Sequence, residues 1–88
     1  MLNIAVLVSG GGTNLQALLD SEARGENPNG KIKLVVASKP GVYALERAAK
    51  AGVEGCVVRR KDYATSEEFD TALLSVLKGH GIELVVLA

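Results

Sequence analysis

The apolar residues of the chain gather in four short runs, and the segments between them show helical periodicity. The runs cover residues 3–8, 31–37, 56–58 and 82–87. Short, nearly continuous apolar runs that are bounded by Gly, Pro or Ser are typical of strands buried on both faces. We therefore predict four strands.

Three intervening stretches carry apolar residues at α-helical spacing. The expected buried stripes are Leu15, Leu18 and Leu19; Val42, Leu45, Ala48 and Ala49; and Phe69, Ala72, Leu73, Val76 and Leu77. Thr13 or Asn14 is expected to cap the first helix, and Thr65 or Ser66 the third. Glu68 follows Thr65 by three residues, which is the spacing of a capping box. The strand–helix alternation predicts an α/β, Rossmann-like open parallel sheet with helices on both faces.

The turn between the first strand and the first helix, Ser9-Gly10-Gly11-Gly12-Thr13-Asn14, carries the main chemical signal. Ligands of open parallel sheets bind beyond the carboxyl ends of strands, and glycine lets the backbone approach a ligand closely. The free N–H groups and the dipole of a helix N-terminus favour an anion. Because the loop holds no Lys or Arg, a phosphate would rest on backbone and neutral donors. The alternative is a tight turn in which Gly serves geometry alone and Thr or Asn serves as a cap.

Two nucleotide-binding motifs describe this turn less well. It lacks the Gly-Lys-Ser/Thr of a triphosphate loop. Gly10 and Gly12 match the first two glycines of the dinucleotide fingerprint, but Leu15 stands in the place of the third. The second strand ends in Ser38-Lys39, a pair that could meet a ribose 2′-phosphate. An NADP- or nucleotide-binding module without transferase chemistry therefore stays open as an alternative function.

Composition narrows the classes of partner. The 88 residues form one small domain, and ten basic and ten acidic residues give a formal net charge of zero. That balance provides no electrostatic footprint for nucleic acid or an anionic membrane. With no apolar stretch of about 18 residues and no signal peptide, we expect a cytoplasmic protein. Cys56 is interpreted as a buried strand residue and His80 as a solvated helix-stop residue, and no metal is expected.

Several segments resemble the phosphoribosylglycinamide formyltransferase family. They are residues 3–17, Ala44-Leu45-Glu46-Arg47-Ala48, Glu67-Glu68-Phe69-Asp70 and Leu84-Val85-Val86-Leu87-Ala88. The most specific of them contains Ser-Gly-x-Gly-Thr-Asn-Leu-Gln. The resemblance covers the chain in order and identifies residues 1–88 as the N-terminal, ribonucleotide-binding part of a formyltransferase domain, ending after the fourth strand.

The resemblance implies transfer of a formyl group from the co-substrate 10-formyltetrahydrofolate to the amine of glycinamide ribonucleotide, in purine biosynthesis. Gly12, Thr13 and Asn14 would hold the ribonucleotide phosphate, with Gly11 shaping the turn. Leu87 would line the folate pocket. At the position of Ser66 family members often carry an Arg that contacts folate.

The family's catalytic Asn, His and Asp lie beyond Ala88, so the resemblance implies no catalytic residue within this chain and no activity for the chain alone. Further strands of the family fold would continue outward from the fourth strand. Without them that strand is an apolar edge with Glu83 as its only charged guard. We expect residues 82–87 to self-associate or to pair with the C-terminal half of the fold.

Overall fold

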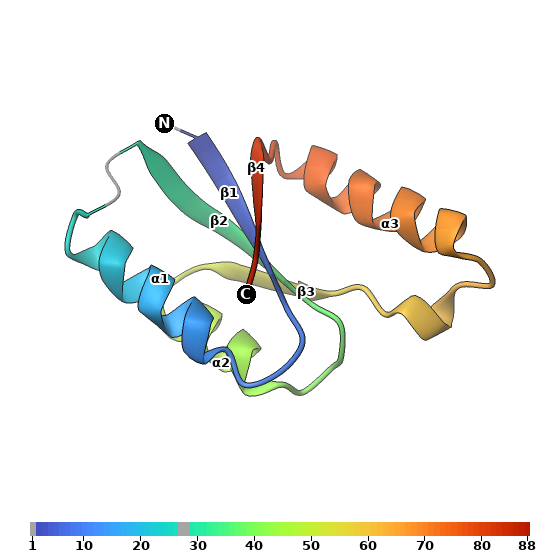
Figure 1. Ribbon diagram of the computed structural model, residues 1–88, viewed down its shortest axis with the longest axis horizontal. Helices are drawn as coiled ribbons and strands as arrows, with labels where there is room; N and C mark the ends of the chain where they lie inside the picture. The colour runs from blue at the N-terminus through green and yellow to red at the C-terminus, as the bar shows by residue number, and fades with distance from the viewer. Residues whose placement is uncertain (1, 27–28) are drawn as a thin grey trace.

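The computed structural model describes residues 2–26 and 29–88, whose strands form a four-stranded parallel sheet (Figure 1). In chain order the elements are β1 (Leu2–Val8), α1 (Thr13–Ala23), β2 (Gly30–Ala37), α2 (Tyr43–Lys50), β3 (Glu54–Val57), the 3₁₀ helix η1 (Arg60–Asp62), α3 (Ser66–Gly79) and β4 (Leu84–Leu87). The strand order is β3-β2-β1-β4, and each neighbouring pair is parallel. The predicted strand–helix alternation is confirmed, and the fourth strand lies beside the first.

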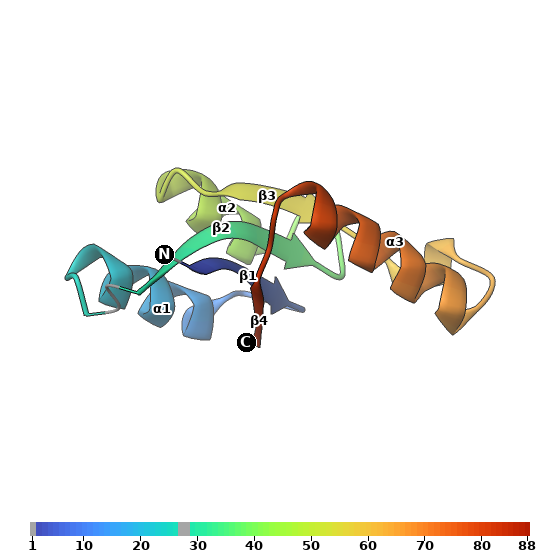
Figure 2. The ribbon, with the colours of Figure 1, turned by 90° about the horizontal axis from the view of Figure 1, so that it is seen from above.

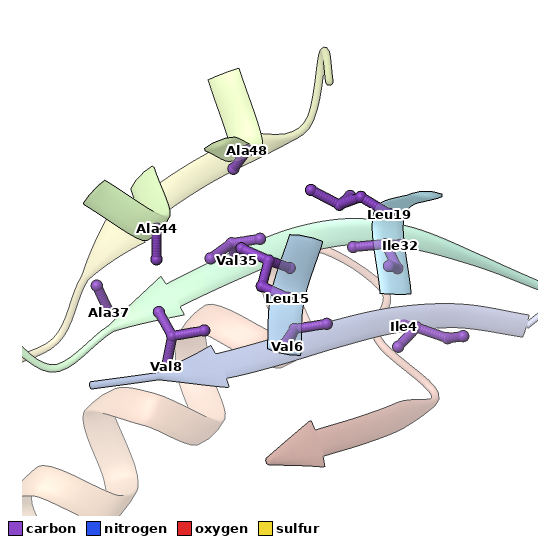
Figure 3. Close-up of a cluster of buried hydrophobic side chains, with 10 residues drawn as sticks. All are labelled: Ile4, Val6, Val8, Leu15, Leu19, Ile32, Val35, Ala37, Ala44 and Ala48. Atoms are coloured by element: carbon purple, nitrogen blue, oxygen red, sulfur yellow. The ribbon is translucent and has the colours of Figure 1, made fainter. Parts of the chain in front are cut away.

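The sheet separates two hydrophobic clusters. Helices α1 and α2 cover one face and α3 covers the other (Figures 1 and 2). Figure 3 shows the larger cluster, which contains Ile4, Val6, Val8, Leu15, Leu19, Ile32, Val35, Ala37, Ala44 and Ala48. The smaller cluster contains Ala5, Leu34, Val36, Val58 and Leu77. The Rossmann-like arrangement with helices on both faces is therefore confirmed.

A bulge in β2 determines which side chains face α1. Ile4 of β1 pairs with Ile32, but the next residue, Ala5, pairs with Leu34, so Lys33 has no partner in β1. An extra residue of this kind shifts the alternation of side chains by one position. As a result Ile32 and Val35 lie in the same cluster although they are three positions apart. The bulge accounts for a strand whose sequence alternates at first and then becomes continuously apolar.

The predicted buried stripes of the helices are only partly correct. Leu18 is 36% exposed, because it lies beside β4 at an open cavity of about 290 Å³. On α2 the buried residues are Ala44 and Ala48, whereas Ala49 is exposed. On α3 Leu77 alone is buried, and the other predicted positions are half-buried. A single helix covers that face of the sheet, so its flanks stay open to solvent.

The N-terminus of α3 confirms the predicted cap. The Thr65 hydroxyl accepts a hydrogen bond from the Glu68 N–H at 3.1 Å. The Glu68 carboxylate in turn accepts from the N–H of Ala64, also at 3.1 Å. In a standard capping box the carboxylate accepts from the N–H of the cap residue itself, whereas here it accepts from the N–H of the residue before the cap. Two backbone donors that precede the helical ladder are satisfied in this way.

The boundaries of the two short strands differ from the prediction. β3 begins at Glu54 and ends before Val58, which is buried beyond the strand. β4 begins at Leu84, because the Ile82 N–H closes α3 by bonding to the carbonyl of Leu77. The carboxylate of Glu83 accepts a hydrogen bond from the Asn3 N–H at 3.0 Å. Glu83 is therefore turned toward β1 and does not guard the outer edge of β4, contrary to expectation.

Candidate functional site

The candidate site is the turn that joins β1 to α1 at the carboxyl edge of the sheet. Gly12 is the N-cap of α1 and has φ 82° and ψ 31°, in the left-handed region. Its carbonyl accepts the first helical hydrogen bond, from the N–H of Gln16 at 2.8 Å. The prediction that Thr13 or Asn14 caps the helix is wrong, since both residues lie inside it. The positive φ explains the difference, because glycine adopts it without the steric penalty that a Cβ brings.

Gly12 also lies close against α2. A Cβ built on Gly12 would lie 2.7 Å from the Cβ and 3.0 Å from the Cα of Ala44, closer than real side chains come. Cβ atoms built on Gly10 and Gly11 would meet nothing within 4 Å, and neither residue has a positive φ. The steric need for glycine, expected over the whole triplet, is thus concentrated at Gly12.

The first turn of α1 has the properties of an anion site. The N–H groups of Thr13, Asn14 and Leu15 precede the first hydrogen bond of the helical ladder, so they have no carbonyl partner within α1. The side chains of Thr13 and Asn14 are exposed beside them. The helix dipole adds about 0.3–1 kcal/mol of stabilisation for an anion at an exposed terminus. The geometry can therefore bind phosphate without a charged side chain in the loop.

A cation supports the turn from outside. The Arg47 Nε of α2 donates a hydrogen bond to the carbonyl of Gly11 at 2.8 Å, and Nη1 donates to Oε1 of Gln16 at 3.1 Å. The guanidinium carbon lies 4.7 Å from the centroid of the Tyr43 ring. Inspection of the loop alone missed Arg47. Right-handed crossovers that proceed in one direction along a parallel sheet place their helices on the same face, so a cation in α2 could have been considered.

The two positions expected to contact folate lie in different layers. Leu87 ends β4 beside Leu7 of β1 and is 80% exposed, at the same edge as the glycine turn. Ser66 begins α3 on the other face of the sheet. Its hydroxyl accepts a hydrogen bond from Nη2 of Arg60 at 3.2 Å. Leu87 therefore lies at the edge that carries the turn, and Ser66 lies at the start of α3, bonded to Arg60.

His80 is not the freely solvated residue that the sequence suggested. Its Nδ1 lies 2.8 Å from the carbonyl oxygen of Val76, and its Nε2 lies 2.7 Å from a carboxylate oxygen of Glu54. Both partners only accept, so the imidazolium alone can satisfy the two together. Both hydrogen bonds raise the pKa of His80, and the bond to the Val76 carbonyl has the larger effect. Glu54 is the first residue of β3, so this pair joins two layers at the amino edge, opposite the glycine turn.

Cys56 is half-buried in β3, less buried than expected. Its burial, and secondarily the charge of Glu54, raise the pKa of the thiol. The thiolate is the nucleophilic form, so Cys56 is a weak nucleophile at neutral pH.

Residues 2–26 and 29–88 contain neither a cluster of metal ligands nor a membrane-spanning helix. In these ranges no three His, Cys, Asp or Glu side chains gather closely enough to hold a metal ion. None of the helices in the same ranges is long and apolar enough to cross a bilayer.

Comparison with known proteins gives a consistent result. Residues 2–88 match the family model described as formyl transferase. The chain is 44% identical to the trifunctional purine biosynthetic protein adenosine-3 of Chironomus tentans, over 97% of the chain and 6% of the insect protein. It is 40% identical to the phosphoribosylglycinamide formyltransferase of Haemophilus influenzae, over the whole chain and 41% of that relative. The crystal structure of glycinamide ribonucleotide transformylase 1 from Symbiobacterium toebii superimposes with a TM-score of 0.93 at 42% identity, over the whole chain and 41% of that protein. The chain thus spans less than half the length of these relatives.

Proposed function

The chain belongs to the formyl transferase family, and on that premise we propose that residues 1–88 form the phosphate-binding part of a phosphoribosylglycinamide formyltransferase. In the proposed reaction the amine of glycinamide ribonucleotide receives the formyl group of 10-formyltetrahydrofolate. We assign the ribonucleotide phosphate to Gly12, Thr13 and Asn14, with Gly11 in the preceding turn. The cytoplasm, where we expect purine biosynthesis, is the proposed location.

One observation carries this proposal. The left-handed Gly12 turn delivers the chain directly into an eleven-residue helix whose first side chains are exposed. Phosphates bind at such helix N-termini because the free N–H groups and the dipole act together. Arg47 adds a positive charge next to the turn through its bond to the Gly11 carbonyl. The match to the formyl transferase model includes the turn and both helices.

The proposed contribution of this part to the reaction is positioning. A phosphate held at the turn fixes one end of the ribonucleotide and restricts where its amine can lie relative to the formyl donor. Fixing two reactants in this way reduces the entropy lost on reaching the transition state. We propose that Leu87, at the same edge, lines the folate pocket. Ser66, at the start of α3, has a shorter side chain than the Arg that family members often carry there, so we assign it no folate contact. The general acid–base group and the oxyanion donors are proposed to come from the C-terminal half of the fold.

A titration of the ¹⁵N-labelled chain with glycinamide ribonucleotide tests the phosphate assignment. We expect saturable NMR shifts in the amides of Gly11 to Asn14. Thr13→Ala should weaken binding about two- to tenfold, through loss of one donor and not of a helix cap. Thr71→Ala on α3 is the matched control and should change nothing. Gly12→Val is unsuitable, because a branched side chain would collide with Ala44 and confuse misfolding with lost binding.

Competition with NADP separates the proposal from its alternative, a nucleotide-binding module without transferase chemistry. We expect glycinamide ribonucleotide to bind and NADP not to displace it. Displacement by NADP at comparable concentration, or shifts that avoid the turn, would contradict the assignment.

A further inference from the structure

A second cavity lies at the carboxyl ends of β2 and β3, and the glycine turn does not line it. It has a volume of about 570 Å³ and is lined by Ser38, Lys39, Pro40, Arg59, Arg60 and Lys61. Two backbone hydrogen bonds hold its walls together. The Ser38 N–H donates to the carbonyl of Val8, and the Val58 N–H donates to the carbonyl of Ala37, each at 3.0 Å. The segments after β1, β2 and β3 therefore meet at one edge of the sheet.

The cavity concentrates positive charge in a chain whose net charge is zero. Four of the ten basic residues line it, together with one serine and one proline. Asp62 is a nearby acid, but its carboxylate lies 3.9 Å from the Arg59 Nε, and both side chains contact solvent. An exposed pair at that distance is weak, and one carboxylate leaves the four cations in clear excess. Arg60 is held by two neutral acceptors, the Tyr63 carbonyl at 3.1 Å and the Ser66 hydroxyl at 3.2 Å.

We propose that this cavity binds a small anion that carries two or more phosphate groups. The cations come from two separate loops, with Lys39 after β2 and Arg59 to Lys61 after β3. A ligand with two anionic groups can engage both loops at once, whereas a single phosphate engages one. Guanidinium groups pair with phosphate oxygens in a two-pronged geometry, and lysines act as mobile point charges beside them. The volume lies within the range of small-molecule sites.

This site is independent of the proposed role of the glycine turn. Its ligand would be held by charged side chains of the β2 and β3 loops, and the ribonucleotide phosphate by backbone groups of α1. A chain that fails to bind glycinamide ribonucleotide could still bind this anion, and the reverse also holds. The two proposals therefore fail separately.

Inorganic pyrophosphate is the probe, titrated into the full ¹⁵N-labelled chain at constant ionic strength. We expect saturable shifts in the amides of Ser38, Lys39, Gly41 and residues 59–62, with at least tenfold tighter binding than inorganic phosphate. The double variant Lys39→Ala/Lys61→Ala should lose at least tenfold in affinity. Lys39→Arg/Lys61→Arg preserves both charges and should stay within threefold of the parent. Lys33→Ala/Lys78→Ala removes two exposed lysines elsewhere and should stay within twofold.

Two results would overturn the proposal. Shifts confined to residues 10–14 would place pyrophosphate at the glycine turn. A loss of affinity in the Lys33→Ala/Lys78→Ala control equal to that in the Lys39→Ala/Lys61→Ala variant would show that binding depends on the net charge of the chain and not on this cavity. Dispersed amide spectra of each variant before titration show that its fold is intact, and the Lys→Arg variant shows whether charge is the property that matters.

Discussion

Alanine substitutions at the three adjacent glycines of the turn should have sharply different effects on stability. At Gly12 a new Cβ would meet the Ala44 Cβ at 2.7 Å, and the backbone would have to keep φ at 82°. At Gly10 and Gly11 the Cβ would enter open space with no left-handed backbone. The three variants therefore make the same chemical change in one loop, at positions that differ in their packing and in their backbone dihedral angles.

The expected size follows from two separate penalties at Gly12. Holding a residue with a Cβ in the left-handed region costs about 1–2 kcal/mol. Overpacking against Ala44 adds about 1–3 kcal/mol. The sum, about 2–5 kcal/mol, is a large part of the roughly 4–13 kcal/mol expected for the free energy of unfolding of a chain of this size. Gly10→Ala and Gly11→Ala should be neutral or stabilising by up to about 1 kcal/mol, because alanine restricts the unfolded chain.

Urea unfolding followed by circular dichroism measures each change. A double-mutant cycle with Ala44→Gly isolates the contact between the two Cβ atoms, since it removes the 2.7 Å contact and leaves both the dihedral strain and the 3.0 Å contact to the Cα of residue 44. We expect a favourable coupling of about 1–3 kcal/mol between Gly12→Ala and Ala44→Gly, equal to the overpacking removed. Equal destabilisation by Gly10→Ala and Gly12→Ala, or a coupling near zero, would refute the packing argument.

Four further outcomes are expected. Arg47→Ala should weaken phosphate binding by about 0.5–1.5 kcal/mol in an NMR titration. Arg47→Lys should not restore it, because the single nitrogen of an ammonium cannot occupy the positions of both Nε and Nη1, which bond to Gly11 and Gln16. The pKa of His80 is raised in the folded chain, so the stability that His80 contributes is fully present below its unfolded pKa and is lost as the pH rises through its folded pKa. The urea midpoint of the parent should therefore fall between about pH 6 and pH 8.5. Glu54→Gln should make that fall smaller, because it removes one of the two bonds to the imidazolium. Val85, 41% exposed on β4, should mediate self-association, and Val85→Lys should lower the sedimentation-average mass. The isolated chain should not consume 10-formyltetrahydrofolate above the blank rate in an absorbance assay.

The sequence pattern predicted the elements and their layers well because strong local signals agreed with each other. Continuous apolar runs and intervening helical stripes suffice to predict a parallel sheet covered on both faces. The bulge at Lys33 was beyond such reasoning, because it depends on how β2 pairs with β1. The exposure of Leu18 was missed for a similar reason. Periodicity identifies the apolar side of a helix but not how far the neighbouring sheet extends beneath it.

The sequence predicted where the candidate turn lies in the fold, but not the contacts that hold it there. The glycine turn stands out in the sequence, and the structure places it at the carboxyl edge as expected. Which glycine is required depends on Ala44, which is 32 positions from Gly12 in sequence and in contact with it in space. Arg47 was likewise absent from the prediction, because its bond to Gly11 crosses 36 positions. The basic cavity could not be predicted, because Lys39 and the run Arg59-Arg60-Lys61 are 20 positions apart in sequence and only the pairing of β2 with β3 brings their loops together.

These long-range contacts would hold the proposed anion site in a fixed geometry. Three consecutive glycines would make the turn the most mobile part of the chain if it stood alone, and a phosphate bound by backbone N–H groups needs them held in place. Helix α2 meets that need at two points, by packing Ala44 against Gly12 and by bonding Arg47 to the Gly11 carbonyl. The cluster in Figure 3 then ties α1 and α2 to the same face of the sheet. The unit that would bind phosphate is therefore β1-α1-β2-α2 as a whole, and substitutions in α2 that never touch the ligand should change its affinity.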